Sequence, residues 1–162
     1  MVMGYENVCY ESNRKGMTTI NIGFYTCFYG DNNNTAFQIP EIPVTIDGHG
    51  GVPHRQLNSK YYYYTNNKSL LAELEDTDWI GIFDDQPLTS STLDSCMISK
   101  RIKAMPNEYL ELRKYDYLCY LDSKVNQINE KVVLDLVSEH FMGGDKAILM
   151  RQHWYIDNNV WE

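Results

Sequence analysis

Residues 117–122 read YLCYLD, and this stretch decides the fold. Its unbroken run of apolar and aromatic residues is typical of a strand that is covered on both faces, as the inner strands of a parallel sheet are. Asp122 ends the run. In such a sheet, the loops that follow the carboxyl ends of neighbouring strands meet in a ligand-binding crevice, so we expect Asp122 to lie there.

Similar runs of β-branched and aromatic residues predict the rest of the sheet. Together with the run above, the predicted strands are residues 20–28, 60–65, 79–83, 117–121 and 147–150. The tyrosines at positions 61–64 fit a strand with side chains on alternating faces better than a platform for sugar stacking. Prolines and glycines in residues 40–53 leave room for at most a short edge strand at 44–46.

Helical periodicity fills the segments between these strands. Ser69 is predicted to cap a short helix, and Asn129 a longer one before the last strand. Another helix is predicted to begin at Ser91 or Thr92 and to end before Pro106. This helix carries the apolar residues Leu93, Met97 and Ala104, with Lys100, Arg101 and Lys103 near its end. Strands that alternate with helices imply an α/β domain whose mostly parallel central sheet is flanked by helices.

Composition bounds the size and the partners of this domain. The 162 residues suit one domain, and the unpatterned residues 1–18 are predicted to be an N-terminal tail or extension of a domain at 19–162. A formal net charge of -8 disfavours nucleic acid as a partner. No apolar run reaches the roughly 20 residues of a membrane helix, and the scattered cysteines match no zinc or disulfide pattern. We therefore expect a cytoplasmic protein without a membrane span.

Asp122 and a basic cluster are the candidate functional residues, and each has two interpretations. A carboxylate at the end of a parallel strand can hold a divalent cation that neutralises a diphosphate, or it can simply turn the chain. Lys100, Arg101 and Lys103 can meet phosphate oxygens, with Arg101 as the best single candidate. They can also complement the dipole at a helix end. Residue spacing alone leaves both pairs of interpretations open.

The basic cluster and Asp122 belong to a series of motifs that resembles a known family. In chain order the motifs are INIGFYTCFYGD, YYYYTNN, SKRIKAMP, YDYLCYLDSKV and RQHWYIDNNVWE. Over residues 20–162 their order is similar to that in a plant and bacterial glycosyltransferase-like family, formerly a domain of unknown function, and in chlorella-virus glycosyltransferases that modify capsid protein. The most specific parts are Thr26 and the sequence Tyr120-Leu121-Asp122-Ser123, which looks like the YxDG or YxDS element of the family.

This resemblance implies a GT-A fold and a glycosyltransferase, which moves a sugar from a nucleoside-diphosphate sugar, such as a UDP-sugar, to a hydroxyl group of a glycan or glycoprotein. It implies that the nucleobase and the ribose lie beside Tyr25, Thr26 and Cys27. It also implies that Arg101 and Lys103 face the diphosphate.

The resemblance further implies that Asp122 holds a divalent metal, manganese or magnesium, or the ribose. His153, Asp157 and Glu162 would lie near the donor sugar and the acceptor, and one of them would take the acceptor proton if the reaction inverts the anomeric centre. Lys124 departs from the family pattern, because it stands where a full DxD motif has its second acid. The lysine can itself offset phosphate charge, which makes the metal less necessary. The chain also ends at Glu162, where GT-A domains commonly continue, so we expect a domain truncated on the acceptor side.

Two other functions stay open. The first is a module that holds a nucleotide sugar without turning it over, which Lys124 and the early C-terminus favour. The second is a structural or interaction domain without a small ligand, in which Asp122 and Arg101 are surface features.

Overall fold

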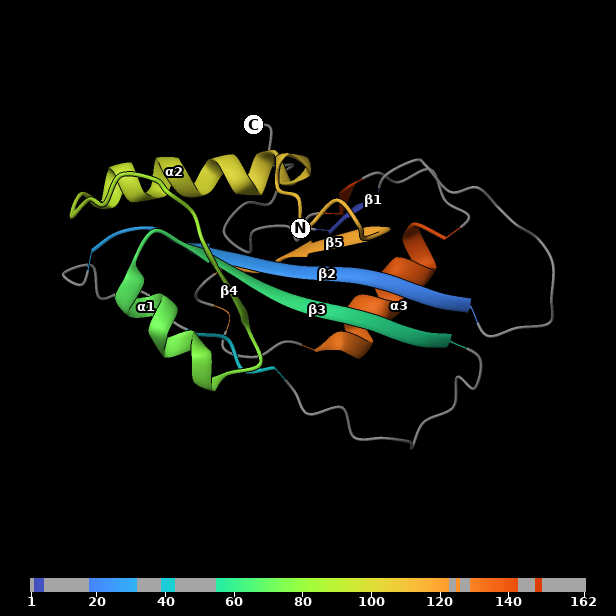
Figure 1. The fold of residues 1–162 in the computed structure, drawn as a ribbon. Coiled ribbons are helices and arrows are strands. Elements are labelled where there is room, and N and C mark those ends of the chain that lie inside the picture. The colour runs from blue at the N-terminus through green and yellow to red at the C-terminus, as the bar shows by residue number, and fades with distance from the viewer. Residues whose placement is uncertain are drawn as a thin grey trace.

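A computed structural model describes residues 2–4, 18–31, 39–42, 55–122, 125, 129–142 and 148–149 of the chain (Figure 1). The described strands form one sheet in the order β4-β3-β2-β5-β1-β6. Their bounds are Val2–Gly4 for β1, Thr18–Phe28 for β2, Arg55–Thr65 for β3, Ile80–Phe83 for β4, Tyr117–Tyr120 for β5 and Ile148–Leu149 for β6. The α-helices are α1 (Lys68–Glu73), α2 (Thr92–Ala104) and α3 (Glu130–His140), and the short 3-10 helices are η1 (Leu74–Asp76) and η2 (Pro106–Glu108).

Four neighbouring strands, β4, β3, β2 and β5, all run parallel, so the chain has the α/β fold with a parallel sheet that the sequence predicts. The central strand β2 is held on both sides: Phe24 pairs in register with Tyr61 of β3 and with Cys119 of β5. Both neighbours of β2 are thus parallel to it. Both faces of β2 are also covered, which explains why most of its residues from Ile20 to Phe28 are apolar or aromatic.

Strand β1 lies within the segment that the sequence assigns to a tail. Val2–Gly4 pairs antiparallel with both β5 and β6, with Val2 opposite Cys119 and Leu149. Three residues are too few to show the alternation that marks a strand in sequence, and the backbone groups at the edge of β5 decide their conformation instead. The predicted edge strand at 44–46 lies outside the described residues.

Side chains of β2 and β3 point alternately to two hydrophobic clusters, one on each face of the sheet. The cluster on one face includes Phe24 and Tyr63 and is covered by α1 and α3 through Leu70 and Val137. The cluster on the other face includes Tyr25, Cys27, Tyr62 and Tyr64, and Ile102 of α2 covers it. Figure 1 shows α2 above the sheet, on the side away from α1. The prediction that the tyrosine run alternates between faces is confirmed.

Helix caps agree with the sequence at α2 and α3 but not at α1. Ser91 caps α2 and Asn129 caps α3, each by accepting a hydrogen bond from a backbone N–H of the first turn. At α1 the cap is Asn67, whose side chain accepts from the N–H groups of Ser69 and Leu70, so the prediction of Ser69 was wrong. Asparagine competes well with serine for this role because both carry an oxygen at the required distance.

The inward face of α2 does not carry the apolar residues that stand out in its sequence. Leu93 and Met97 are 71% and 55% exposed and Ala104 is exposed as well, whereas Ser95 and Ile102 are buried. The small serine lets the helix backbone approach β2 closely, where the Cys27 sulfur lies 4.0 Å from the carbonyl oxygen of Ser99. The rotation of α2 about its axis is therefore set by the close packing of the helix on the tyrosine-rich face of the sheet. It is not set by the largest apolar side chains of the helix. Within the described residues, no helix is both long and apolar enough to cross a membrane.

Candidate functional site

The parallel strands place the candidate site at the carboxyl end of the sheet. The chain begins this part of the sheet at β2, adds β3 and β4 on one side, and then crosses to β5 on the other side of β2. The connections after β2 and β5 therefore leave in opposite directions. Parallel sheets commonly bind ligands beside the strand ends where the connections diverge in this way. Asp122 lies here and is exposed, just beyond the end of β5. A backbone hydrogen bond of 2.9 Å from the N–H of Leu121 to the carbonyl oxygen of Tyr25 keeps this end of β5 against β2.

The buried thiol of Cys27 lies close to two charged groups at the carboxyl end of the sheet. Burial raises the pKa of the Cys27 thiol to about 12, so the group is a neutral thiol and not a nucleophilic thiolate at neutral pH. The carboxylate of Asp122 raises this pKa further, and the ammonium group of Lys103 lowers it. Both charges therefore lie at the end of β5: Asp122 follows the last residue of the strand, Tyr120, by two positions, and Lys103 of α2 contacts the Tyr120 ring.

Lys103 is positioned by an aromatic ring of β5. Its ammonium nitrogen lies 5.0 Å from the centroid of the Tyr120 ring, within the range of a cation–π contact. The Tyr120 hydroxyl oxygen lies 4.0 Å from the Cys27 sulfur, and its ring packs edge-on against Tyr25 with centroids 5.3 Å apart. The ring is therefore fixed from below, and it offers the half-buried Lys103 side chain a rigid surface.

Arg101 does not join Lys103. Its Nε and Nη2 atoms both lie 3.0 Å from Oε2 of Glu108, and its side chain is 61% exposed. The Glu108 carboxylate, followed by the more distant Tyr109 and Asp84, raises the pKa of the guanidinium. Residues two positions apart lie roughly 200° apart around a helix. Arg101 and Lys103 thus occupy opposite flanks of α2, whereas the resemblance placed both on one diphosphate.

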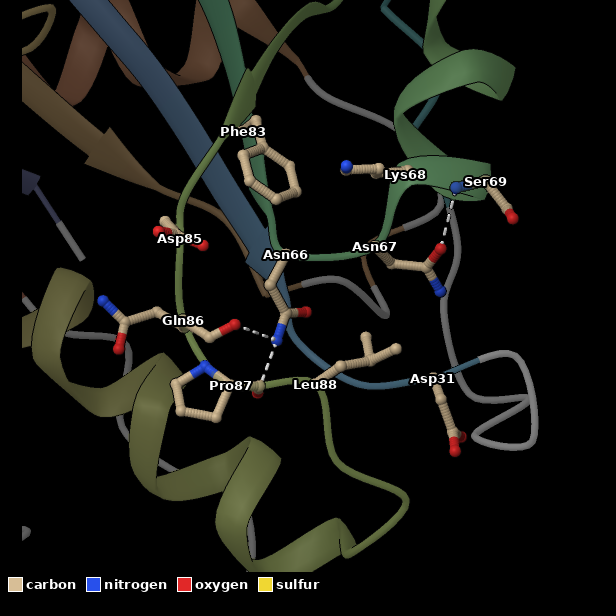
Figure 2. A pocket seen from close by; sticks show the side chains of 10 residues that line it. All are labelled: Asp31, Asn66, Asn67, Lys68, Ser69, Phe83, Asp85, Gln86, Pro87 and Leu88. Atoms are coloured by element: carbon tan, nitrogen blue, oxygen red, sulfur yellow. Dashed lines mark hydrogen bonds between the residues drawn. The ribbon is translucent and has the colours of Figure 1, made fainter.

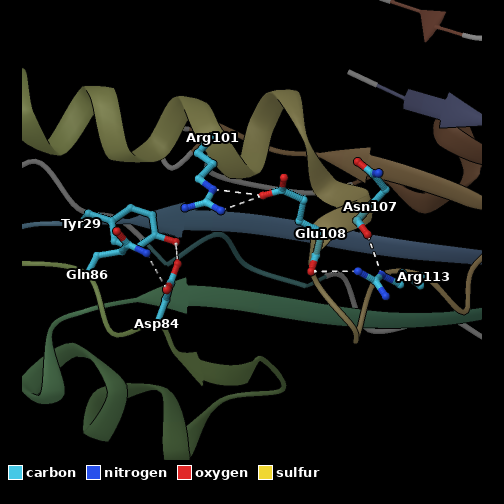
Figure 3. A network of polar contacts seen from close by, with 7 residues as sticks. All are labelled: Tyr29, Asp84, Gln86, Arg101, Asn107, Glu108 and Arg113. Carbon is cyan, nitrogen blue, oxygen red and sulfur yellow. Dashed lines mark hydrogen bonds and ion pairs between the residues drawn. The ribbon is translucent and has the colours of Figure 1, made fainter.

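Figure 3 shows the polar contacts on the Arg101 flank. The Tyr29 hydroxyl donates a hydrogen bond of 2.6 Å to Oδ2 of Asp84, and Gln86 Nε2 donates one of 3.1 Å to Oδ1 of the same carboxylate. Burial raises the pKa of Tyr29, and its contact with Asp84 raises it further. Asp84 therefore ties the end of β2 to the loop after β4, and its carboxylate is engaged in holding these loops together.

The residues that the resemblance places beside the nucleobase and ribose are all buried. Tyr25, Thr26 and Cys27 are at most 3% exposed, because β2 is covered by helices on both faces. The Thr26 hydroxyl oxygen has no hydrogen-bond partner among the described residues. These side chains support the end of the sheet from within, and the exposed surface above them belongs to Asp122 and α2.

The remaining predicted site residues, His153, Asp157 and Glu162, lie outside the described residues, and so does Lys124. The described part of the chain contains no group of three His, Cys, Asp or Glu side chains that could hold a metal ion. Asp122 is a single carboxylate and does not make a metal site alone. The side chains that the structure describes therefore do not fit a resident metal.

A hollow at the same end of the sheet was not anticipated from the sequence. It has a volume of about 830 Å³ and lies where β2, β3 and β4 end (Figure 2). Its lining residues are Asp31, Asn66, Asn67, Lys68, Ser69, Phe83, Asp85, Gln86, Pro87 and Leu88. They come from three separate segments of the chain, which is why no local motif announces the hollow. The paired asparagines after the tyrosine run and the DDQPL loop are its only traces in sequence.

Two neighbouring asparagines build the floor of this hollow. Asn66 and Asn67 are each 5% exposed, and they hold opposite sides of Gly30: Asn66 Oδ1 accepts from its N–H at 3.1 Å, and Asn67 Nδ2 donates to its carbonyl at 3.1 Å. Gly30 has φ 145°, a conformation that side-chain-bearing residues rarely adopt. Asn66 Nδ2 also donates to the carbonyl oxygens of Gln86 and Pro87, at 3.2 and 2.8 Å. The ends of β2, β3 and β4 are thereby joined.

No protein family, curated protein or solved structure matches the chain.

Proposed function

We propose that the chain has a GT-A fold and transfers a glycosyl group from a nucleoside-diphosphate sugar, such as a UDP-sugar, to a hydroxyl group on a glycan or glycoprotein. The observation that carries this proposal is the place of Asp122 and Lys103 at the end of β5: Asp122 follows the strand, and the Lys103 ammonium lies 5.0 Å from the ring centroid of Tyr120, the last residue of the strand. A carboxylate and an ammonium group at the place where strand order reverses suit a ligand that carries both hydroxyls and phosphates.

In this proposal, Lys103 stabilises the leaving diphosphate. Negative charge grows on the phosphate oxygens as the bond to the sugar breaks, and an ammonium group that is already in place lowers the energy of that state. Lys103 is half-buried and held over the Tyr120 ring, so its charge is less screened by solvent than that of a free surface lysine. Arg101 can add to this charge only if it leaves Glu108, its ion-pair partner on the other flank of α2.

Asp122 orients the donor by accepting hydrogen bonds from hydroxyl groups of its ribose or sugar. Manganese or magnesium binding at Asp122 would need ligands from beyond the described residues, and no step is derived through such an ion. The acceptor proton needs a base if the reaction inverts the anomeric centre, and His153, Asp157 and Glu162 are the candidates. A retaining reaction would not need a base at that position.

Thermal unfolding in the presence of UDP or GDP, with manganese, magnesium or EDTA, tests the proposal. A ligand at 100 times its dissociation constant adds about 2.7 kcal/mol to stability, and a chain of this size gains roughly 2–4 °C per kcal/mol. We expect Asp122→Asn to abolish most of this stabilisation. Asp116→Asn is the matched control, because Asp116 is an exposed aspartate at the opposite end of β5. The proposal fails if no nucleoside diphosphate stabilises the chain, or if the two variants respond alike.

A binding module without turnover is the second candidate, favoured by Lys124 at the position of the second acid of a DxD motif. A product assay with UDP- and GDP-sugars separates the two functions. Stabilisation by the nucleotide without transfer or hydrolysis of the sugar indicates the module. A structural or interaction domain without a small ligand predicts no stabilisation at all.

A further inference from the structure

The hollow at the ends of β2, β3 and β4 combines apolar and polar surface within one small volume. Phe83 and Leu88 are 41% and 59% exposed, so both present apolar side chains to solvent. Lys68 contributes a cation, and Asp31 and Asp85 contribute carboxylates. Figure 2 shows these side chains arranged around the buried amide of Asn66. A pocket with an apolar wall and a few polar groups is the usual form of a small-molecule site.

The Phe83 ring is the flat apolar element of the hollow. The Lys68 ammonium nitrogen lies 5.6 Å from its centroid, and the ring still keeps more than a third of its surface exposed. An exposed aromatic ring can pack against the C–H face of a sugar ring or against a nucleobase. The ring therefore suits a ligand that has an apolar face, such as the C–H face of a sugar ring.

The charges of the hollow argue against a phosphate as its occupant. Asp31 and Asp85 carry two negative charges against the single positive charge of Lys68, and like charges disfavour an incoming anion. Ionised carboxylates only accept hydrogen bonds, so the groups that they bind best are hydroxyls and N–H groups. A neutral ligand with several hydroxyl groups meets both conditions.

The walls of the hollow are fixed before any ligand arrives. Asn66 Nδ2 holds the carbonyl oxygens of Gln86 and Pro87, and the N–H of Asp31 donates to the carbonyl of Thr89 at 3.0 Å. These hydrogen bonds join the segment after β2 to the segment after β4, which carries Asp85 and Leu88. A site that is already ordered loses little entropy when it binds, which favours binding of a small ligand.

We propose that this hollow binds a neutral ring with neighbouring hydroxyl groups, which packs its apolar face on Phe83 and donates hydrogen bonds to the carboxylate of Asp85. The ribose of a nucleoside and a pyranose of a glycan share this chemistry. Neither Asp122 nor Lys103 lines the hollow. The proposal of this binding site therefore does not rest on the transfer reaction proposed above, and the two proposals can fail separately.

Backbone amide chemical shifts in NMR test the proposal on the full chain. Uridine, methyl β-D-glucopyranoside and inorganic pyrophosphate are titrated separately. We expect at least one of the two ring compounds to shift the amides of residues 66–69 and 83–88, and pyrophosphate to leave them in place. A response to uridine alone identifies a nucleoside, a response to the glucoside alone identifies a glycan residue, and a response to both supports the shared ring chemistry. If neither ring compound shifts these residues, or if pyrophosphate shifts them instead, the proposal is overturned.

Two substitutions locate the binding. Phe83→Leu and Asp85→Asn should each raise the dissociation constant of the ring compound roughly fivefold, the loss expected for one stacking contact or one hydrogen bond. The matched controls are Leu110→Ala, on an exposed apolar residue outside the hollow, and Asp78→Asn, on an exposed aspartate before β4. Thermal unfolding checks that each variant is folded. Unchanged affinity in both hollow variants, or an equal loss in the controls, contradicts the proposal.

Discussion

The ammonium nitrogen of Lys103 lies 5.0 Å from the ring centroid of Tyr120, and the hydroxyl of the same ring lies 4.0 Å from the Cys27 sulfur. One aromatic side chain thus connects a surface cation to the buried interior of β2. Lys114 makes a similar contact elsewhere, with its ammonium 5.4 Å from the Tyr62 ring. Lys114 also contacts the Tyr115 ring, at 5.5 Å, so both lysines make cation–π contacts but at different places in the fold.

This similarity gives a controlled test of the charge at the proposed site. We expect Lys103→Met to remove most of the stabilisation by a nucleoside diphosphate, because the ammonium group would no longer offset the phosphate charge. Lys114→Met loses a comparable cation–π contact, worth about 0.5–1 kcal/mol at an exposed site. It should leave the nucleotide effect intact. Thermal unfolding with and without UDP measures both, and an equal response of the two variants would remove Lys103 from the site.

Asn67 should contribute more to stability than its position after a strand suggests. Its side chain caps α1 and also donates to the carbonyl of Gly30. We expect Asn67→Ala to lower the free energy of unfolding by about 1–3 kcal/mol, from a lost cap and a lost buried hydrogen bond. Asn58→Ala is the control, since Asn58 is exposed and its side chain donates a hydrogen bond to the side chain of Asn21. Urea denaturation that shows equal losses for both variants would contradict the role of Asn67.

Gly23 is predicted to tolerate no side chain. A Cβ atom there would lie 2.7 Å from Cδ2 of Tyr115 and 2.9 Å from Cδ2 of Leu118. The Tyr115 ring cannot easily move, because its hydroxyl lies 2.9 Å from that of Tyr62. Gly23→Ala should therefore lower the free energy of unfolding by about 1–3 kcal/mol, the usual range for overpacking.

Gly81→Ala is the comparison for Gly23→Ala. The nearest obstacle at Gly81 is the terminal Cδ1 atom of Leu71, at 2.7 Å, on a half-buried and flexible side chain. This side chain can turn aside, so the loss should be smaller than at Gly23. Chemical denaturation of both variants measures the difference, and a larger loss at Gly81 would show that the Tyr115 ring yields more readily than its hydrogen bond implies.

Two buried thiols should couple stability to alkaline pH. Burial raises the pKa of Cys27 to about 12 and that of Cys119 to about 11. Each group keeps its proton longer in the folded chain than in the unfolded chain. Its contribution is therefore complete below the unfolded pKa, near 9, and is lost as the pH rises toward the folded value.

We expect the free energy of unfolding to fall above about pH 9, by at most about 1.4 kcal/mol per pH unit for each thiol. Cys27→Ala should make this fall shallower, while Cys96→Ala, at an exposed position, should leave the slope unchanged. Urea denaturation at several alkaline pH values measures the slopes. Identical slopes for the two variants would mean that Cys27 ionises in the fold as easily as in the unfolded chain.

The sequence predicted the strands correctly where a short continuous segment is buried on both faces of the sheet. The strands β2, β4 and β5 consist largely of apolar and aromatic residues, and Asp122 followed directly from the end of such a run. In β3 only the tyrosine run was recognised, because the first half of the strand, residues 55–59, is mostly polar. The rotation of α2 could not be predicted from the sequence, because apolar residues lie on more than one face of the helix. In the structure, the face with Ser95 and Ile102 packs against the tyrosines. The separation of Arg101 from Lys103, by contrast, follows from helical geometry and was available in the sequence.

The hollow could not be predicted in the same way. Asp31, Asn66 and Phe83 become neighbours only through the parallel pairing of β2, β3 and β4, and no spacing in the chain records that pairing. The sequence shows two polar residues after a strand, which commonly means a turn. Their role as a floor depends on contacts with the backbone of other segments.

The grip of Asn66 and Asn67 on Gly30 has a consequence for mutational coupling. Both side-chain amides hold Gly30 in place, so substituting one asparagine already releases part of the restraint that the other provides. The loss in free energy of unfolding from the double substitution should therefore be smaller than the sum of the two single losses. Variation at either position then relaxes selection on the other, so the asparagines are expected to be kept or lost as a pair.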